Sequence, residues 1–173
     1  MPHIARIPGR LMTTASADVP LKGLTFLLEA LAKVRVECPQ AHLVVIGRLK
    51  EGSGMPALID SLGLDGAVEF VTGVTDERIV ELYAEAEVAV VPSLYEGFSL
   101  PAIEAMATGI ALVATDGGAL PEVTGRDGDT VLACRAGDAD ALAATIRRGL
   151  DDESLRTRVG DRKSYYSQNY KIK

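Results

Sequence analysis

The stretch VAVVPSLYEGFSLPAIEAM, Val88–Met106, contains an apolar run, a polar loop and an alanine-rich segment in succession. The run Val88–Ser93 is almost continuously apolar, which is typical of a parallel strand that is covered on both faces. Pro101 suits the first turn of a helix, because a backbone amide has no helical partner there. The stretch therefore predicts a strand–loop–helix unit, which is the building block of a parallel α/β sheet.

The same alternation continues on both sides of this stretch. We expect five further strands, at Leu11–Thr14, His42–Gly47, Val68–Gly73, Ala111–Thr115 and Thr130–Ala133. Helices are expected at Leu21–Val36, Met55–Leu62, Asp76–Ala86, from Pro101 to about Ala107, and at Leu120–Val123, Asp138–Gly149 and Asp152–Tyr166. The pattern predicts one α/β domain over residues 1–173, with a doubly wound, mostly parallel six-stranded sheet and helices on both faces.

The composition argues against several classes of protein. A net charge of −6 is unlike that of a nucleic-acid binder, which carries a basic face. No apolar run approaches the ~20 residues of a membrane span, so we expect no transmembrane segment. We also expect no signal peptide and a cytoplasmic location, and leave open whether the full-length protein associates peripherally with a membrane.

Cys38 and Cys134 form no C-x-x-C pattern, so neither a disulfide framework nor a zinc site is indicated. Of the two histidines, His3 and His42, the second opens an apolar strand and is interpreted as structural.

The loop after the quoted strand has the chemistry of an anion site. The amides of Gly97–Leu100 precede the predicted helix, which cannot pair them, and the positive end of its dipole lies behind them. Glu104 falls about one turn into that helix, where its carboxylate could accept hydrogen bonds from the two hydroxyls of a ribose. Glu96 lies on the other side of the expected phosphate position, within reach of a sugar. The alternative is a structural turn that contains two unrelated glutamates.

The segment Ser93–Val123, SLYEGFSLPAIEAMATGIALVATDGGALPEV, resembles the signature of the retaining glycosyltransferases of family 4, which have the two-domain GT-B architecture. Their mark is a glutamate, seven residues and a second glutamate, as in Glu96 and Glu104. The stretches PLKGLTFLLEAL, HLVVIG, LGLDGAVEFVTGV, LYAEAEVAVVPS and AGDADALAATIRRGLDD follow the order and spacing of that family up to about Arg158. The resemblance implies a Rossmann-like domain, one half of a GT-B fold, that binds a nucleoside diphosphate sugar.

The resemblance also implies a role for each matching position. Glu96 would contact the transferred sugar, and Lys22 would neutralise the diphosphate and support the leaving group. Glu104 would bind the ribose, and the backbone near Val74 would read the base. The diphosphate and sugar would meet the amides of Gly97, Phe98, Ser99 and Leu100. The family uses cations of the protein in place of a metal, so we expect neither a metal nor another cofactor.

Two departures from the family pattern accompany these assignments. The family usually has Gly-Arg-Leu shortly before the lysine, whereas this chain has Ser16-Ala17-Asp18. Arg48, at the carboxyl end of a predicted strand, is a candidate substitute cation, and the alternative is a solvated loop arginine. The chain also resembles only the donor-binding half of a GT-B enzyme, so we expect a partner domain that binds the acceptor and no transfer by this domain alone. A stand-alone nucleotide-sugar-binding module is the alternative function. A GT-B-shaped epimerase is disfavoured, because it needs a histidine and carboxylates at other positions.

Overall fold

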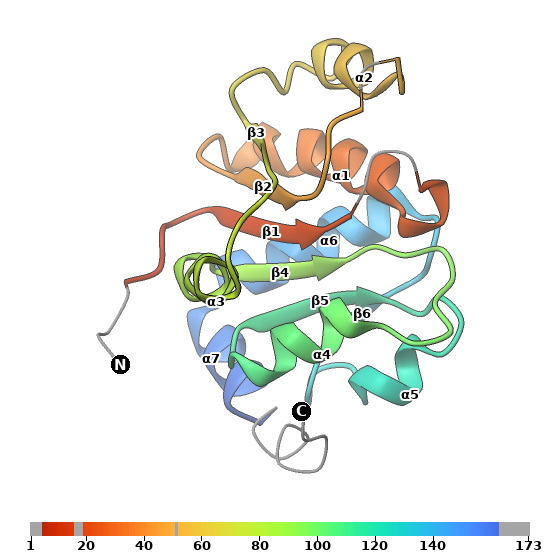
Figure 1. Cartoon of the computed structure of the whole chain (residues 1–173). Coiled ribbons are helices and arrows are strands. Elements are labelled where there is room, and N and C mark those ends of the chain that lie inside the picture. The colour runs from red at the N-terminus through yellow and green to blue at the C-terminus, as the bar shows by residue number, and fades with distance from the viewer. Residues whose placement is uncertain (1–4, 16–18, 51, 163–173) are drawn as a thin grey trace.

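A computed structural model describes residues 5–15, 19–50 and 52–162 of the chain. Its strands are β1 (Arg10–Thr14), β2 (His42–Ile46), β3 (Val68–Val71), β4 (Val88–Val91), β5 (Ala111–Thr115) and β6 (Leu132–Cys134). They form one sheet in the order β3-β2-β1-β4-β5-β6, and every neighbouring pair is parallel (Figure 1). The predicted doubly wound sheet is confirmed. Its order reverses between β1 and β4, and in sheets of this kind the ligand crevice lies beside this point, at the carboxyl ends of the strands.

Helices cover both faces of the sheet. They are α1 (Leu24–Glu37), α2 (Met55–Ser61), α3 (Asp76–Glu85), α4 (Leu100–Ala107), α5 (Leu120–Thr124), α6 (Ala139–Asp151) and α7 (Glu153–Arg162). One apolar cluster joins the sheet to α1, α2, α6 and α7, and a second joins the opposite face to α3, α4 and α5. Strand β4 serves both clusters, because Val88 and Val90 belong to the first and Ala89 and Val91 to the second. Successive side chains of a strand point to opposite faces, so a central strand needs apolar residues at every position.

The segment expected as one helix over Leu21–Val36 consists of two elements. A 3-10 turn, η1 (Pro20–Lys22), precedes α1, and Gly23 separates them with a φ of 77°. A Cβ at Gly23 would lie 1.9 Å from the carbonyl oxygen of Pro92, so only glycine permits this close approach. The interruption places Lys22 in a loop at the carboxyl end of β1, directly beside the end of β4.

The remaining boundaries differ from the predicted ones by small amounts. Strand β6 begins at Leu132 and ends at Cys134, whereas the prediction had Thr130–Ala133. Thr130 instead donates from Oγ1 to the carbonyl of Thr124, which ties the preceding loop to the end of α5. The described part of α7 ends at Arg162, and the rest of the helix predicted to Tyr166 lies outside the described residues.

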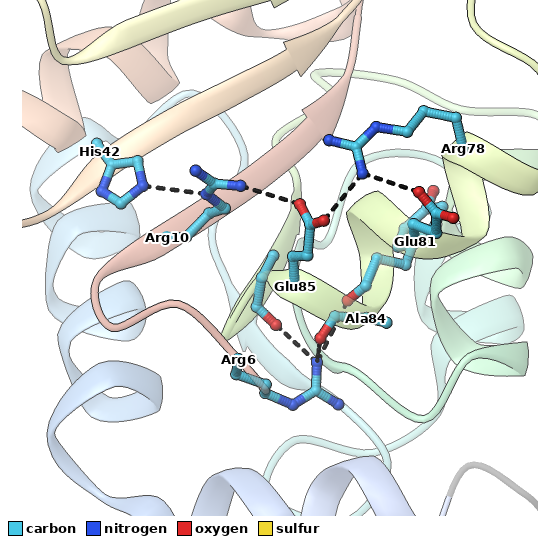
Figure 2. A network of polar contacts seen from close by, with 9 residues as sticks. Arg6, Arg10, His42, Arg78, Glu81, Ala84 and Glu85 are labelled. Carbon is cyan, nitrogen blue, oxygen red and sulfur yellow. Dashed lines mark hydrogen bonds and ion pairs between the residues drawn. The ribbon is translucent and has the colours of Figure 1, made fainter. Parts of the chain in front are cut away.

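A polar network ties α3 to the amino ends of β1 and β2, at the edge of the sheet opposite the crevice (Figure 2). Arg10 donates from Nε to Nε2 of His42 over 3.1 Å and pairs with Glu85 over 3.1 Å. Nδ1 of His42 lies 2.9 Å from the carbonyl of Gln40, so Nδ1 carries the proton and Nε2 is the acceptor. Arg78 completes the network by pairing with the same Glu85 over 2.9 Å. His42 is thus engaged in structural contacts, in agreement with its interpretation from the sequence.

Among the described residues, no helix is both long and apolar enough to cross a membrane.

Candidate active site

Three loops converge at the carboxyl edge of the sheet. They follow β1, β4 and β5, which are neighbours in the sheet, and they lie together at the right of Figure 1. The amide of Leu94 donates to the carbonyl of Leu21 over 2.8 Å, which joins the β4 loop to η1. The amide of Ala119 donates to the carbonyl of Glu96 over 2.7 Å, which joins the β5 loop to the β4 loop. The three loops therefore form one connected surface above the switch point of the sheet.

An ion pair occupies the centre of this surface. Nζ of Lys22 lies 2.7 Å from Oε1 of Glu96, and Oγ of Ser93 donates to the same oxygen over 2.8 Å. The side chain of Glu96 is only 7% exposed, whereas that of Lys22 is 35% exposed. Burial of a carboxylate is costly unless it is paired and hydrogen-bonded, and these two donors meet that need. An ammonium has three donors, so Lys22 can hold Glu96 and still bind a solvent-side anion.

Two glycines of the β5 loop allow the backbone of Glu96 to sit against that loop. A Cβ at Gly118, whose φ is 57°, would lie 2.4 Å from the carbonyl oxygen of Glu96. A Cβ at Gly117 would lie 2.6 Å from the carbonyl oxygen of Ser93. Contacts this short are impossible for any side chain, so the Gly-Gly pair is a requirement of the site.

The start of α4 presents backbone amides to the same surface. Ser99 is the N-cap residue, and its Oγ accepts from the amide of Ala102 over 3.2 Å. Pro101 lies in the first turn, as the sequence predicts. The amides of Gly97–Leu100 donate to none of the other residues that the structure describes. Phe98 and Leu100 are 60% and 56% exposed, so their side chains lie at the surface. Free amides in front of a helix N-terminus can bind an anion.

Glu104 lies on α4, half-buried, beside the phenol of Tyr83 from α3. The hydroxyl of Tyr83 donates to Oε2 of Glu104 over 3.5 Å, which is a long and weak hydrogen bond. Burial is the main cause that raises the pKa of Tyr83 to about 12, and the charge of Glu104 acts in the same direction. Tyr83 therefore stays a neutral donor throughout the physiological range.

Arg48 and Val74 follow the carboxyl ends of β2 and β3, and so belong to the same edge of the sheet. Arg48 is exposed and Val74 is half-buried. Neither has a hydrogen bond or ion pair to Lys22, Glu96 or Glu104 in the described part of the chain. The structure thus pairs Lys22 with Glu96, which directly precedes Gly97–Leu100 in the chain, and shows no such direct contact for Arg48 or Val74 among the described residues. The departure at Ser16–Asp18 lies outside the described residues.

The sequence placed the loop Asp116–Ala119 at the ligand-binding edge of the sheet, but it did not identify Ser93, Tyr83 or the close approach of Gly117 and Gly118 as parts of this site. A Gly-Gly dipeptide directly after a predicted strand is a signal that the backbone makes a close approach there. Ser93 and Tyr83 carry no comparable signal, because only the tertiary contacts show which side chains they meet. Within the described ranges, no cluster of His, Cys, Asp and Glu side chains could hold a metal ion.

The strand order and the crevice at the switch point define a Rossmann-like α/β domain. The family model described as "Glycosyl transferases group 1" matches residues 8–164, so this chain belongs to that family. It is 45% identical, over 92% of its length, to the MMP alpha-(1->4)-mannosyltransferase of Mycolicibacterium hassiacum, of which it spans 39%.

Solved structures agree with this membership. The chain is similar to sucrose-phosphate synthase from Thermosynechococcus elongatus, with 30% identity and a TM-score of 0.84 over 94% of this chain and 41% of that one. It is also similar to the C-terminal domain of the glycosyl transferase group 1 family protein LpcC from Francisella tularensis, with 26% identity and a TM-score of 0.82 over 96% of this chain and 89% of that one. The resemblance to the C-terminal half of a GT-B glycosyltransferase is thereby confirmed.

Proposed function

We propose that this chain is the donor-binding domain of a retaining, metal-independent glycosyltransferase of family 4. The observation that carries the proposal is the ion pair between the part-exposed Lys22 and the buried Glu96, next to the α4 amides that have no partner among the described residues. A nucleoside diphosphate sugar has an anionic centre between a ribose and a sugar. The surface has hydrogen-bond donors between two carboxylates, those of Glu104 and Glu96. This arrangement follows the order of the ligand's groups: ribose, diphosphate and sugar.

In the proposed complex, the diphosphate lies between the ammonium of Lys22 and the amides of Gly97–Leu100. Glu104 accepts hydrogen bonds from the ribose hydroxyls, and the backbone near Val74 contacts the base. Arg48, exposed at the neighbouring strand end, is available to add a second cation. The transferred sugar lies over Glu96, whose oxygen Oε1 is already engaged by Lys22 and Ser93.

Stabilisation of the leaving diphosphate depends mainly on the cations and the backbone amides. When the bond between the sugar and the diphosphate breaks, negative charge develops on the leaving diphosphate. Fixed donors that are already aimed at that position stabilise the charge without reorganising. The α4 amides without a partner among the described residues are such donors, and Lys22 adds a positive charge beside them. For this reason we propose that no divalent metal is needed.

In this proposal, another part of the whole protein binds the acceptor. The chain spans less than half of the length of the mannosyltransferase and the synthase that it resembles. Transfer needs an acceptor held in line with the donor carbon, and orientation of that kind lowers a barrier by several kcal/mol. We propose that a second domain provides this orientation, so that the enzyme as a whole is the transferase.

Titration of the chain with UDP, GDP and ADP, followed by amide chemical shifts, tests the proposal. We expect perturbations at Lys22, Gly73–Val74 and Gly97–Glu104, and equal binding in magnesium and in EDTA. The remote residue Thr145 of α6 is the internal control and should not shift. Perturbations centred on α6 and α7 would contradict the site, and loss of binding in EDTA would contradict its independence of metal.

A further inference from the structure

Ser93 is the buried side chain that holds Glu96 in place. Ser93 is 1% exposed and Glu96 6% exposed, and they belong to one loop that begins where β4 ends. The hydroxyl of Ser93 lies 2.8 Å from Oε1 of Glu96. An ionised carboxylate can only accept, so the hydroxyl of Ser93 is the donor in this bond.

The position of Ser93 is itself determined by β5. Oγ1 of Thr115 donates to the carbonyl of Ser93 over 2.5 Å, and both residues are buried. The backbone of Gly117 also lies close to this carbonyl oxygen, because a Cβ added at Gly117 would be only 2.6 Å from it. The backbone of Ser93 is therefore anchored to the neighbouring strand, and its hydroxyl has a defined place from which to donate.

Ser93 and Lys22 both donate to the same oxygen of Glu96, but only one of these two donors is free to move away from it. Lys22 is 35% exposed at its side chain and carries donors that a diphosphate would attract. Ser93 is buried, so it has no access to a ligand in solution. None of the hydrogen bonds among the described residues reaches Oε2 of Glu96, which leaves that oxygen for a ligand.

We propose that Ser93 is a positioning residue: it holds Oε1 of Glu96 so that Oε2 faces the donor sugar, and keeps doing so when Lys22 turns to the diphosphate. This inference rests on the proposed function. It implies that Ser93 acts only through Glu96, and so affects the sugar of the donor and not its nucleotide.

Calorimetric titration of the chain with GDP and GDP-mannose, and with UDP and UDP-glucose, tests this role in Ser93→Ala. We expect the affinity for the free nucleotide to change by less than about twofold, and the affinity for the matching sugar nucleotide to fall roughly 5- to 30-fold. Ser93→Thr keeps the hydroxyl and should restore most of the loss. Ser93→Cys keeps the volume but donates weakly, so it should resemble Ser93→Ala. Thr145→Val, which removes a buried hydroxyl from the remote helix α6, should change neither affinity.

A double substitution separates positioning from general destabilisation. In a Glu96→Ala background, Ser93→Ala should add no further loss of sugar-nucleotide affinity, because the carboxylate through which Ser93 acts is already absent. Equal losses for nucleotide and sugar nucleotide, no loss at all, or additive losses in the double variant would each overturn the role of Ser93. Absence of nucleotide binding in the wild-type chain would instead overturn the proposed function, and this inference with it.

Discussion

Glu96 and Glu104 lie on either side of the α4 N-terminus in different surroundings. Glu96 is buried under two donors at 2.7 and 2.8 Å, whereas Glu104 is half-buried and meets only a distant phenol among the described side chains. A carboxylate with one oxygen held by the protein presents its other oxygen in a fixed direction, whereas one with both oxygens largely available contributes through several new hydrogen bonds. The two residues are therefore expected to act on different parts of the ligand.

Substitution of each glutamate by alanine should separate these roles. Glu104→Ala should weaken the binding of free nucleotide by roughly 1–3 kcal/mol, because it removes charge-assisted hydrogen bonds to the ribose. Glu96→Ala should leave that affinity nearly unchanged and should weaken only the binding of the sugar nucleotide. Calorimetry with the nucleotide and its sugar derivative measures both, and the exposed Glu122→Ala on α5 is the matched control. Equal losses with the free nucleotide would contradict the division.

Tyr83 should make stability depend on alkaline pH. The pKa of its phenol is about 12 in the folded protein and about 10 in an unfolded chain, so the folded state holds the proton more tightly. The resulting stability is fully present below pH ~10 and is lost as the pH rises through ~12, by about 3 kcal/mol in all. Urea unfolding of wild type and Tyr83→Phe should show a stability difference that shrinks over this range. Cys134, whose thiol pKa burial raises to about 11, is present in both proteins and cancels. A difference that is constant with pH would contradict this account.

At the scale of the elements, the site depends on where helices begin. Helix α4 begins at Leu100 behind the Ser99 cap, and the amides of Gly97–Leu100 have no partner among the described residues. Helix α1 begins only after Gly23, so that Lys22 lies in η1 and reaches Glu96. If the chain were helical throughout Leu21–Val36, Gly23 could not sit against Pro92 in its present conformation. The point at which α1 begins therefore determines whether Lys22 can pair with Glu96.

Comparison of Gly23→Ala with Gly63→Ala tests this dependence on element boundaries. Both glycines have positive φ, 77° and 68°, but only Gly23 would place a Cβ against another atom. Gly63→Ala should cost about 1 kcal/mol of stability from backbone conformation alone. Gly23→Ala should cost roughly 1–3 kcal/mol more through the clash with Pro92, and should also abolish nucleotide binding by displacing Lys22. Urea unfolding and nucleotide titration measure the two effects. Similar losses for both variants would mean that the contact with Pro92 is unimportant.

At the scale of the whole molecule, Lys22 and Glu96 lie at the carboxyl edge of the sheet, between the ends of β1 and β4. The strand order places three loops around Lys22 and Glu96, and these loops supply groups suited to a donor. A reacting sugar must also be shielded from water, since otherwise the donor is hydrolysed. The chain is similar to a C-terminal domain of a group 1 glycosyl transferase, and the second domain that we propose would supply this shielding.

We therefore predict that the isolated chain binds donor but transfers no sugar above background. Transfer should appear when the chain is joined to an acceptor-binding domain, in one polypeptide or by mixing. Mass spectrometry of products from a panel of sugar nucleotides and acceptors measures this, and a Glu96→Gln version of the joined protein is the control. Robust turnover by the chain alone would refute the need for a second domain and would direct attention to Arg48 as part of an acceptor site.

The sequence by itself was sufficient for the parallel α/β architecture, because apolar runs of strand length that alternate with helical patterns have few other packed solutions. It also predicted the loop with Glu96, Gly97 and Pro101 as the place of chemistry, since local residue types determine where a helix starts and which amides stay unpaired. Only the tertiary structure decided that Ser93 and Lys22 share one oxygen of Glu96, that Tyr83 faces Glu104, and that Gly118 supports the site. Apart from the Ser93–Glu96 bond, which lies within one loop, these contacts join residues from different βα units. The order of the strands in the sheet brings them together, and spacing along the chain does not encode that order.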